Sequence, residues 1–337
     1  MKVLVTGAAG FIGHHVARRL AETRRCEVLG VDNLSDYYDV ALKRARLEQL
    51  APLEDFRFLQ ADFADAAKFP ALVAHFKPDY VVHLGAQPGV RFSMEQPAAY
   101  TRNNLEGFAT VLEACRRNPP RHLVFASSSS VYGAGAKPPF REDDDANRPV
   151  SYYGATKRAN ELMAYSYAHN HRLNVTGLRF FTVYGPWGRP DMAPHKFTSR
   201  ILEGRPIDVY NHGQMRRDFT YVTDLVQGIL GLIDSVPLRP ATRAEIAEGD
   251  SLSPAAPYRV VNIGNSDKVR LLDFIEALET SSGKTALRNY MDMQPGDVPA
   301  TWADASLLHR LTGYRPNTPV TEGVARFIAW YEEYYRP

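Results

Sequence analysis

"KVLVTGAAGFIG", residues 2–13, joins a short apolar run to three glycines that recur at every third position. The apolar run predicts a buried β-strand, and Gly7, Gly10 and Gly13 then fall in the turn after it and in the first turn of a helix. Because glycine has no side chain, the backbone can approach a pyrophosphate there, which the helix N-terminus binds through its unpaired amides and its dipole. The stretch therefore predicts the first unit of a dinucleotide-binding fold, although a tight turn alone also requires glycine.

An acidic residue follows the glycine turn at the end of the next predicted strand. Asp32 closes "EVLGVD" and lies 19 residues beyond Gly13. A carboxylate in this place accepts a hydrogen bond from an adenosine ribose and repels a 2′-phosphate. Asp32 therefore favours NAD over NADP as the cofactor, while the basic Lys43 and Arg44 nearby weaken that preference slightly.

Short apolar runs alternate with longer amphipathic segments through the first half of the chain. Runs rich in Val, Leu and Phe occur at residues 2–6, 27–32, 56–62, 80–85, 122–127 and 174–181. Helical patterns of at least ten residues separate them, which predicts an α/β fold with a Rossmann-type, doubly wound parallel sheet. Asp62 closes the third run at the same sheet edge as Asp32, where it is a candidate for contact with adenine or a simple turn residue.

The pattern changes in the second half, where proline becomes more frequent and the predicted strands become shorter. We expect an NAD-binding domain in residues 1–180, to which residues 223–234 and 259–265 return. A smaller C-terminal α/β substrate lobe is expected mainly in residues 181–337. Residues 239–257 are rich in Ala, Pro and Glu without an apolar period, which predicts a mobile surface insertion.

Composition and charge exclude several classes of protein. The 337 residues carry 40 basic and 38 acidic side chains without long runs of one sign, so no signature of binding to nucleic acid or a membrane surface is present. The N-terminal stretch is too glycine-rich for a signal peptide, and no apolar run is long enough to span a membrane. Two cysteines in apolar surroundings suit buried thiols, and the histidines do not occur at metal-ligand spacing. We expect a soluble cytoplasmic protein without a metal site.

A tyrosine and a lysine stand one helical turn apart in "SYYGATKRAN", residues 151–160. Residues four apart share a helix face, so Tyr153 and Lys157 can point at one place, although this spacing also occurs by chance. The run "ASSSSVYG", residues 126–133, ends a predicted strand at the sheet edge where ligands of such folds bind. A hydroxyl, a phenol and an ammonium then converge beside the cofactor. A neighbouring cation lowers the tyrosine pKa from about 10 and makes the phenol a base for a sugar hydroxyl.

The motifs "TGAAGFIG", "SSSSVYG" and "YYGATK" resemble, in order and spacing, the extended short-chain dehydrogenases that act on nucleotide sugars. Longer stretches resemble the UDP-glucuronate 4-epimerases: "HLGAQPGVRFSMEQPAAYTRNNLEGF", "LRFFTVYGPWGRPDMA", "KFTSRILEGRPIDVYNHGQMRRDFTYV" and "MQPGDVPATWADAS". This resemblance implies an isomerase that converts UDP-glucuronate to UDP-galacturonate by NAD-dependent epimerisation at C4, through a transient 4-keto intermediate. It also implies a homodimer, with helices near residues 97–118 and 151–171 forming a four-helix interface.

The resemblance assigns roles to individual residues. It implies that Tyr153 is the catalytic base and that Lys157 tunes it while binding the nicotinamide ribose. Ser128 would hydrogen-bond the reacting oxygen, with Ser130 as the alternative. The cofactor residues, from the motifs and the resemblance together, are Gly7, Gly10, Phe11, Ile12, Gly13, Asp32, Asn33, Asp62, Phe63, Leu84, Gly85, Ala86, Gln87, Asn103, Tyr153 and Lys157. The substrate residues are Arg91, Ser128, Tyr153, Thr182, Arg189, Tyr210, Arg217 and Asp297.

Close relatives perform different chemistry after the same first oxidation. A 4-keto uronic acid loses CO₂ when its C5–C6 bond aligns with the carbonyl group, which a decarboxylase promotes and an epimerase prevents. The related dehydratases and decarboxylases carry acidic residues where this chain has Ser129 and Ser130, which favours epimerisation. Galactose epimerases carry arginine and asparagine where this chain has Gln294 and Thr182. UDP-glucuronate decarboxylase, UDP-galactose 4-epimerase and a non-catalytic dinucleotide-sensing protein are the alternatives.

The loop "TVYGPWGR", residues 182–189, is the candidate for recognition of a uronic acid. Arg189 offers a planar fork of donors suited to a carboxylate, and its alternative is a surface ion pair with Asp191. Just beyond, Pro194 and His195 stand where the glucuronate epimerases have bulky apolar residues, which leaves the packing of this loop over the sugar open. For Arg217 and Asp297, the alternative to a role in substrate binding is a surface ion pair. For Thr182, the alternative is packing in the core.

Overall fold

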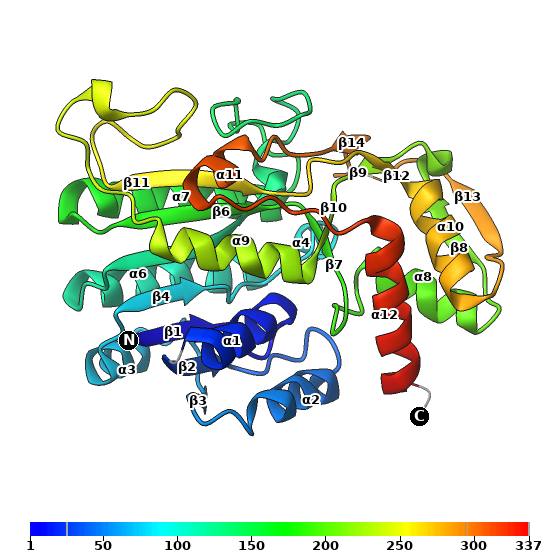
Figure 1. Ribbon diagram of the computed structural model, residues 1–337, viewed down its shortest axis with the longest axis horizontal. Coiled ribbons are helices and arrows are strands. Elements are labelled where there is room, and N and C mark those ends of the chain that lie inside the picture. The colour runs from blue at the N-terminus through cyan, green and yellow to red at the C-terminus, as the bar shows by residue number, and fades with distance from the viewer. Residues whose placement is uncertain (25, 295, 336–337) are drawn as a thin grey trace.

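The structure, a computed structural model, describes residues 1–24, 26–294 and 296–335 and is built around a seven-stranded sheet (Figure 1). The strands run in the order β11–β6–β5–β4–β1–β2–β3, and all neighbours are parallel. They are β1 (Lys2–Thr6), β2 (Glu27–Asp32), β3 (Phe56–Gln60), β4 (Tyr80–His83), β5 (His122–Ser128), β6 (Val175–Phe180) and β11 (Tyr258–Ile263). Each predicted apolar run overlaps one of β1 to β6, with ends that differ by two residues at most, and the predicted Rossmann-type sheet is confirmed.

Two hydrophobic cores cover the two faces of the sheet. On one face pack α1 (Phe11–Arg24), α9 (Val222–Asp234) and α11 (Ser306–Thr312), with α2 (Val40–Leu50) beside α1. On the other face pack α3 (Lys68–Phe76), α6 (Gly107–Arg117) and α7 (Tyr152–His171). Val3 and Val5 enter the first core and Leu4 the second, as the two-residue period of a strand requires. Because both faces are covered, these strands read as continuous apolar runs in the sequence.

After β6 the chain crosses to a second lobe, which lies at the right of Figure 1. Two small sheets join the lobe to the domain: β7 (Thr182–Tyr184) with β10 (Phe219–Tyr221), and β9 (Arg216–Arg217) with β12 (Val269–Arg270) and β14 (Ala300–Thr301). A third core is formed by β8 (Ile207–Tyr210), α8 (Ala193–Leu202), α10 (Leu271–Ser282) and α12 (Val320–Tyr335). The half-exposed strand β13 (Arg288–Met291) pairs with β8. The segments α9, β11 and α11 interrupt the lobe in sequence and pack on the large sheet instead.

Short helical turns occupy several loops. Between β4 and α6 lie α4 (Phe92–Glu95), α5 (Pro97–Tyr100) and the π-helical segment η1 (Thr101–Glu106); the 3-10 turns are η2 (Ser129–Val131), η3 (Asn211–Gly213) and η4 (Arg243–Glu245). A π-helical turn is rare and is often found near a functional site. The turn η4 belongs to the predicted insertion, which is anchored near its end by a 3.0 Å ion pair between Asp250 and Arg259. The mobility of the insertion stays a prediction.

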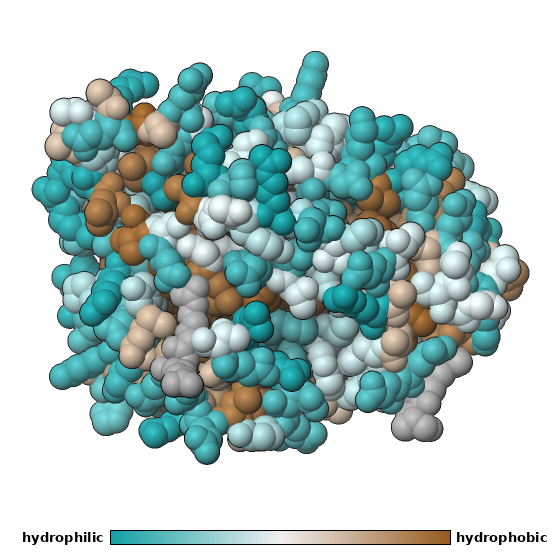
Figure 2. Space-filling model, viewed as in Figure 1, coloured by the Kyte–Doolittle hydropathy of each residue, from teal (hydrophilic) through white to brown (hydrophobic). Residues whose placement is uncertain are grey.

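The surface gives little sign of a macromolecular partner on the face shown in Figure 2. Hydrophilic side chains dominate it, and hydrophobic ones form small separate groups. Within residues 1–24, 26–294 and 296–335, no helix combines the length and apolarity needed to cross a bilayer. The same residues contain no group of three His, Cys, Asp or Glu side chains arranged to hold a metal ion. Cys26 and Cys115 are both buried, and burial raises the pKa of the Cys115 thiol to about 12.

Candidate active site

A cavity of about 1120 Å³ runs along the carboxyl ends of the strands and into the second lobe. It is lined by residues that follow β1, β2, β4 and β5 and by residues of the lobe between 182 and 217 and between 296 and 301. Parallel strands end at one edge of their sheet, so loops that are distant in sequence converge there. All of the predicted catalytic, cofactor and substrate residues except Asp62 line this cavity.

The glycine loop at one end of the cavity fits a pyrophosphate. A Cβ atom at Gly13 would lie 2.0 Å from the carbonyl oxygen of Gly7, so close backbone packing alone requires this glycine. A Cβ atom at Gly10 would come within 4 Å of just one neighbour in the described part of the chain, the Gly7 carbonyl group. Much of the space beside Gly10 is therefore open to the cavity that it lines, which suits a phosphate at the α1 N-terminus.

Asp32 lies beside this loop and is buried. Its two carboxylate oxygens accept the backbone N–H groups of Ala9, at 3.2 Å, and Leu34, at 2.8 Å. A carboxylate has about four lone-pair sites, so Asp32 retains the capacity to bind ribose hydroxyls. Lys43 donates to the carbonyl and hydroxyl oxygens of Ser35 at 2.7 and 3.0 Å, so its ammonium is already engaged within the protein. The arrangement fits NAD better than a cofactor with a 2′-phosphate.

Asp62 is the exception among the predicted residues. The strand β3 ends at Gln60, and Asp62 lies in the turn that follows. One of its carboxylate oxygens accepts the N–H of Ala64 at 2.9 Å, and the other pairs with Arg102 at 2.5 Å. Asp62 therefore stabilises a turn and pairs with Arg102, and Phe63 beside it lines the cavity. Contact between Asp62 and adenine stays a prediction.

Helix α7 carries Tyr153 and Lys157 into the cavity. The Ser151 hydroxyl accepts the N–H of Gly154 at 3.0 Å and caps the helix, so Tyr153 lies in its first turn. The Lys157 Nζ lies 6.0 Å from the centre of the Tyr153 ring and donates to the Ala126 carbonyl oxygen at 2.8 Å. The two side chains thus share one face of the helix beside the end of β5.

The environment of Tyr153 adjusts the pKa of its phenol in both directions. Burial raises this pKa, whereas a hydrogen bond with Ser128 and the charge of Arg189 lower it. Burial also lowers the pKa of Lys157 to about 8, so its ammonium remains mostly charged at neutral pH. A cation next to a phenol favours the phenolate, which is the form that a general base requires. Ser128 contacts Tyr153 and also accepts the N–H of Ser130 at 3.2 Å.

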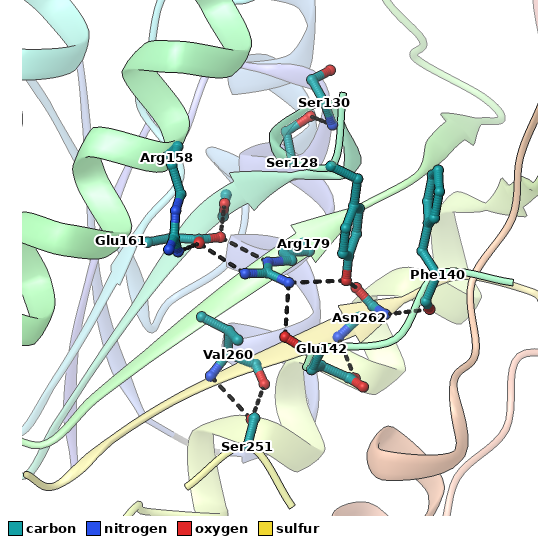
Figure 3. Close-up of polar contacts among 12 residues, drawn as sticks. Ser128, Ser130, Phe140, Glu142, Arg158, Glu161, Arg179, Ser251, Val260 and Asn262 are labelled. Carbon is teal, nitrogen blue, oxygen red and sulfur yellow. Dashed lines mark hydrogen bonds and ion pairs between the residues drawn. The ribbon is translucent and has the colours of Figure 1, made fainter. Parts of the chain in front are cut away.

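A buried polar network lies behind these residues (Figure 3). The Ser127 hydroxyl donates to Glu161 at 2.6 Å, and Arg179 donates to both carboxylate oxygens of Glu161 at 2.8 and 2.9 Å. The side chains of Glu161 and Arg179 are 0% and 3% exposed. Arg179 also donates to the Tyr132 hydroxyl at 3.0 Å, which donates to Asn262 at 2.7 Å. The network therefore ties α7 to β5, β6 and β11 immediately behind the proposed catalytic residues.

The far end of the cavity is positively charged. Arg91 donates to Asp297 at 3.0 Å, and its guanidinium lies 4.4 Å from the centre of the Tyr210 ring. Burial lowers the pKa of Arg217, an effect that Asp297 opposes. Two arginines beside a single aspartate leave a net positive charge, which suits a diphosphate.

Arg189 and Thr182 line the middle of the cavity from the second lobe. The Nε and Nη2 atoms of Arg189 donate to the two oxygens of Asp191, at 3.0 and 2.5 Å. The predicted alternative, a pair with Asp191, is therefore a real contact, but its side chains are only 20% and 22% exposed and both line the cavity. Burial would raise the pKa of Asp191, yet Arg189 holds it below its ordinary value.

The loop after Arg189 packs on the closing helix. The ring of His195 contacts those of Tyr331 and Tyr335 at centroid distances of 5.0 and 5.2 Å, and its Nε2 lies 3.1 Å from the Tyr335 hydroxyl. Pro194 and His195 are both buried. Aromatic contacts with α12 thus hold this loop in place.

Sequence reasoning missed several residues that shape the site. Asn104 exchanges hydrogen bonds with the backbone of Gln87, at 2.8 and 3.0 Å, and so fixes the loop after β4. Arg46 is fully buried and donates to carbonyl oxygens of Ala9 and Trp187, which joins the glycine loop to the second lobe. The signal for Arg46 is weak, because its partners are distant in the chain.

The chain is similar to known proteins in sequence and in structure. The sequence model of the NAD dependent epimerase/dehydratase family matches residues 3–243 of this chain. Over 336 residues the chain is 51% identical to a 37.6 kDa protein in the cld 5′ region of Escherichia coli O111:H-, covering 100% of both chains. It is 47% identical to a probable UDP-glucuronate 4-epimerase of Rhizobium meliloti (strain 1021), covering 100% of this chain and 98% of the relative. The structure of UDP-glucuronic acid 4-epimerase from Bacillus cereus, in complex with UDP-glucuronic acid and NAD, is similar with a TM-score of 0.87 and 33% identity, over 99% of this chain and 100% of that one.

Proposed function

This chain belongs to the NAD dependent epimerase/dehydratase family, and we propose that it is the isomerase that converts UDP-glucuronate to UDP-galacturonate by epimerisation at C4. The observation that carries the proposal is that one cavity combines the glycine loop, the contact between Ser128 and Tyr153, and Arg189. The first suits a dinucleotide, the second a proton transfer, and the third a sugar carboxylate. A non-catalytic dinucleotide sensor requires the first feature alone.

Proton transfer at C4 is assigned to Tyr153. When bound at the glycine loop and Asp32, NAD supplies the hydride acceptor and donor that oxidation and reduction at C4 require. Tyr153 takes the proton of the C4 hydroxyl as the C4–H bond breaks, and returns it to the same oxygen when C4 is reduced from its opposite face. Ser128 hydrogen-bonds that oxygen, and Lys157 stabilises the phenolate. The sugar loses and regains one proton and one hydride, so no external oxidant is consumed.

The turn after β5 supports epimerisation over decarboxylation. Ser129 and Ser130 form this turn and line the cavity, so hydroxyl groups stand where related decarboxylases carry acidic residues. Arg189 and Thr182 offer donors from the second lobe for the C6 carboxylate. We infer that they hold the C5–C6 bond of the 4-keto sugar away from the alignment that expels CO₂.

Product analysis tests this function. Purified protein should carry bound NAD and should convert UDP-glucuronate to a product of the same mass, with the C4 configuration inverted in its NMR spectrum. No net reduced cofactor should accumulate. Formation mainly of a UDP-pentose would assign the protein to the decarboxylases, and a stoichiometric requirement for NADPH would make it a reductase; either result contradicts the proposal.

The proposal extends to domains, assembly and location. Residues 1–180, with 223–234 and 259–265, would bind NAD, and residues 181–337 would mainly bind the nucleotide sugar. On α7, which packs against α6, Leu162 and Tyr165 are 56% and 37% exposed, which supports a homodimer formed by these helices of two copies. Two buried cysteine thiols support a cytoplasmic location. A monomeric mass in sedimentation experiments would contradict the dimer.

A further inference from the structure

A tyrosine from the cofactor side of the cavity contacts the arginine loop of the second lobe. Tyr37 lies between β2 and α2, and its hydroxyl donates to Asp191 at 3.1 Å. Asp191 in turn accepts the Nε and Nη2 protons of Arg189. All three side chains line the cavity. These contacts therefore join the loop that begins at Asp32 to the residue proposed to bind the sugar carboxylate.

Arg189 retains donors for a second partner. A guanidinium has five N–H donors, of which Asp191 accepts one from Nε and one from Nη2. The Tyr37 hydroxyl interacts with the Arg189 guanidinium as well, and its influence is to lower the pKa of Tyr37. Even so, two or more of the five donors remain for another carboxylate, which arginine favours in a paired geometry. Because the guanidinium is planar, the hold of Asp191 on one edge sets the direction of the other.

Tyr37 is itself held in place. Its loop starts where the N–H of Leu34 donates to Asp32 at 2.8 Å, and its ring lies 5.0 Å from that of Phe92. Gly89 makes room for the phenol, because a Cβ atom there would lie 2.6 Å from the Tyr37 hydroxyl oxygen. Burial and then the charge of Asp191 raise the pKa of Tyr37 to about 12, so the hydroxyl keeps its proton and remains a donor at neutral pH.

We propose that Tyr37 is a specificity-determining positioning residue: through Asp191 it holds Arg189 in the orientation that binds a uronic acid in preference to a neutral sugar. This inference rests on the proposed function, since it concerns the same UDP-sugar site. It assigns discrimination between substrates to a contact across the cavity, made by a residue that need not touch the sugar.

Binding measurements on Tyr37→Phe test the proposal. This variant removes the hydroxyl but keeps the ring that packs on Phe92. Calorimetric titration of the NAD-loaded protein should show UDP-glucuronate binding about five- to ten-fold more weakly than to wild type, from the loss of one hydrogen bond to a charged group. Binding of UDP-glucose, which has no carboxylate, should stay within about two-fold. Asp191→Asn, which keeps the shape but removes the charge that orients Arg189, should reduce the preference for UDP-glucuronate at least as much.

Tyr38→Phe is the matched control. Tyr38 is the neighbouring residue, and its hydroxyl accepts a hydrogen bond from Arg46 at 2.6 Å instead of contacting Asp191. This variant should keep the wild-type ratio of the two dissociation constants. A wild-type ratio in folded Tyr37→Phe, or an equal loss of preference in Tyr38→Phe, overturns the proposal. Failure of wild type to epimerise UDP-glucuronate would instead refute the function, because the binding ratio is measured without turnover.

Discussion

Two different kinds of ion pair hold the proposed acid–base end of the cavity and its proposed sugar-binding middle. Behind Tyr153, the pair of Glu161 and Arg179 joins a helix to a strand and is 0% and 3% exposed. In the proposed sugar-binding part, the pair of Arg189 and Asp191 lies within one loop and is 20% and 22% exposed. The residues proposed for proton transfer are therefore held by regular elements, whereas those proposed for sugar recognition lie on loops from both sides of the cavity. We expect damage to the first region to abolish catalysis or folding, and damage to the second to change which sugar is bound.

The largest effect is expected at the base itself. Tyr153→Phe removes the group that takes the C4 proton and should lower kcat by about 10²- to 10⁴-fold, as for other general bases. The affinity for UDP-glucuronate should change far less, because the ring remains. Single-turnover assays and titrations on the same preparation separate the two quantities. Tyr152→Phe is the control, because Tyr152 is exposed and its hydroxyl contacts Thr101. Near-normal turnover in Tyr153→Phe would show that Tyr153 is not the catalytic base.

Breaking the buried pair should cost folding stability. Glu161→Gln leaves Arg179 buried with a weaker partner, and loss of one member of such a pair destabilises by about 3 to 5 kcal/mol. Glu322→Gln is the control, since Glu322 pairs with Arg326 at the surface and such pairs contribute about 0 to 1 kcal/mol. Denaturant unfolding of both variants measures the difference. Equal losses of unfolding free energy would mean that burial does not distinguish the two pairs.

The sequence predicts the parts of the site whose partners are local or whose periodicity is regular. The strands are continuous apolar runs, the glycine loop follows β1 directly, and Tyr153 and Lys157 lie on one helix. Glu161 is also predictable in this way, because it follows Lys157 by four residues and therefore shares its helix face. The role of Asp62 could not be decided from the sequence, because an aspartate after a strand gives the same pattern whether it contacts a ligand or accepts a hydrogen bond in a turn.

Contacts across the cavity could not be predicted in this way. Tyr37 and Asp191 are 154 residues apart, and Arg46 and Trp187 are 141 apart. Nothing in the local pattern of either segment identifies its partner, because these contacts depend on how the second lobe closes over the sheet. A tyrosine in a polar loop is equally typical of an exposed position.

Removal of Arg189 should separate recognition from folding. Arg189→Ala should weaken UDP-glucuronate binding by about 2 to 5 kcal/mol, as expected for a charge pair removed from water. The unfolding free energy should fall less than in Glu161→Gln, because water reaches the Arg189 side chain and can solvate Asp191. Titrations with UDP-glucuronate and UDP-glucose provide the measurement. If binding of both sugars weakens equally, Arg189 does not bind the sugar carboxylate.

The smallest effect concerns pH and the buried ammonium of Lys157. Burial lowers its pKa from 10.5 to about 8 in the folded protein, so between these values the unfolded chain holds a proton that the folded protein has released. Stability rises with pH wherever the unfolded state binds more protons, so the contribution of Lys157 should grow between pH 8 and 10.5 and stay flat outside that window. Relative to Lys157→Met, NAD-free wild type should gain about 1 to 3 kcal/mol of unfolding free energy across it. Lys284→Met is the matched comparison, because Lys284 also donates to a backbone carbonyl, that of Leu202, but from an exposed position where water solvates its charge. If the difference in unfolding free energy between wild type and Lys157→Met stays constant or falls over this window, Lys157 is not held in a desolvated site. The ammonium proposed to stabilise the Tyr153 phenolate would then be solvated by water.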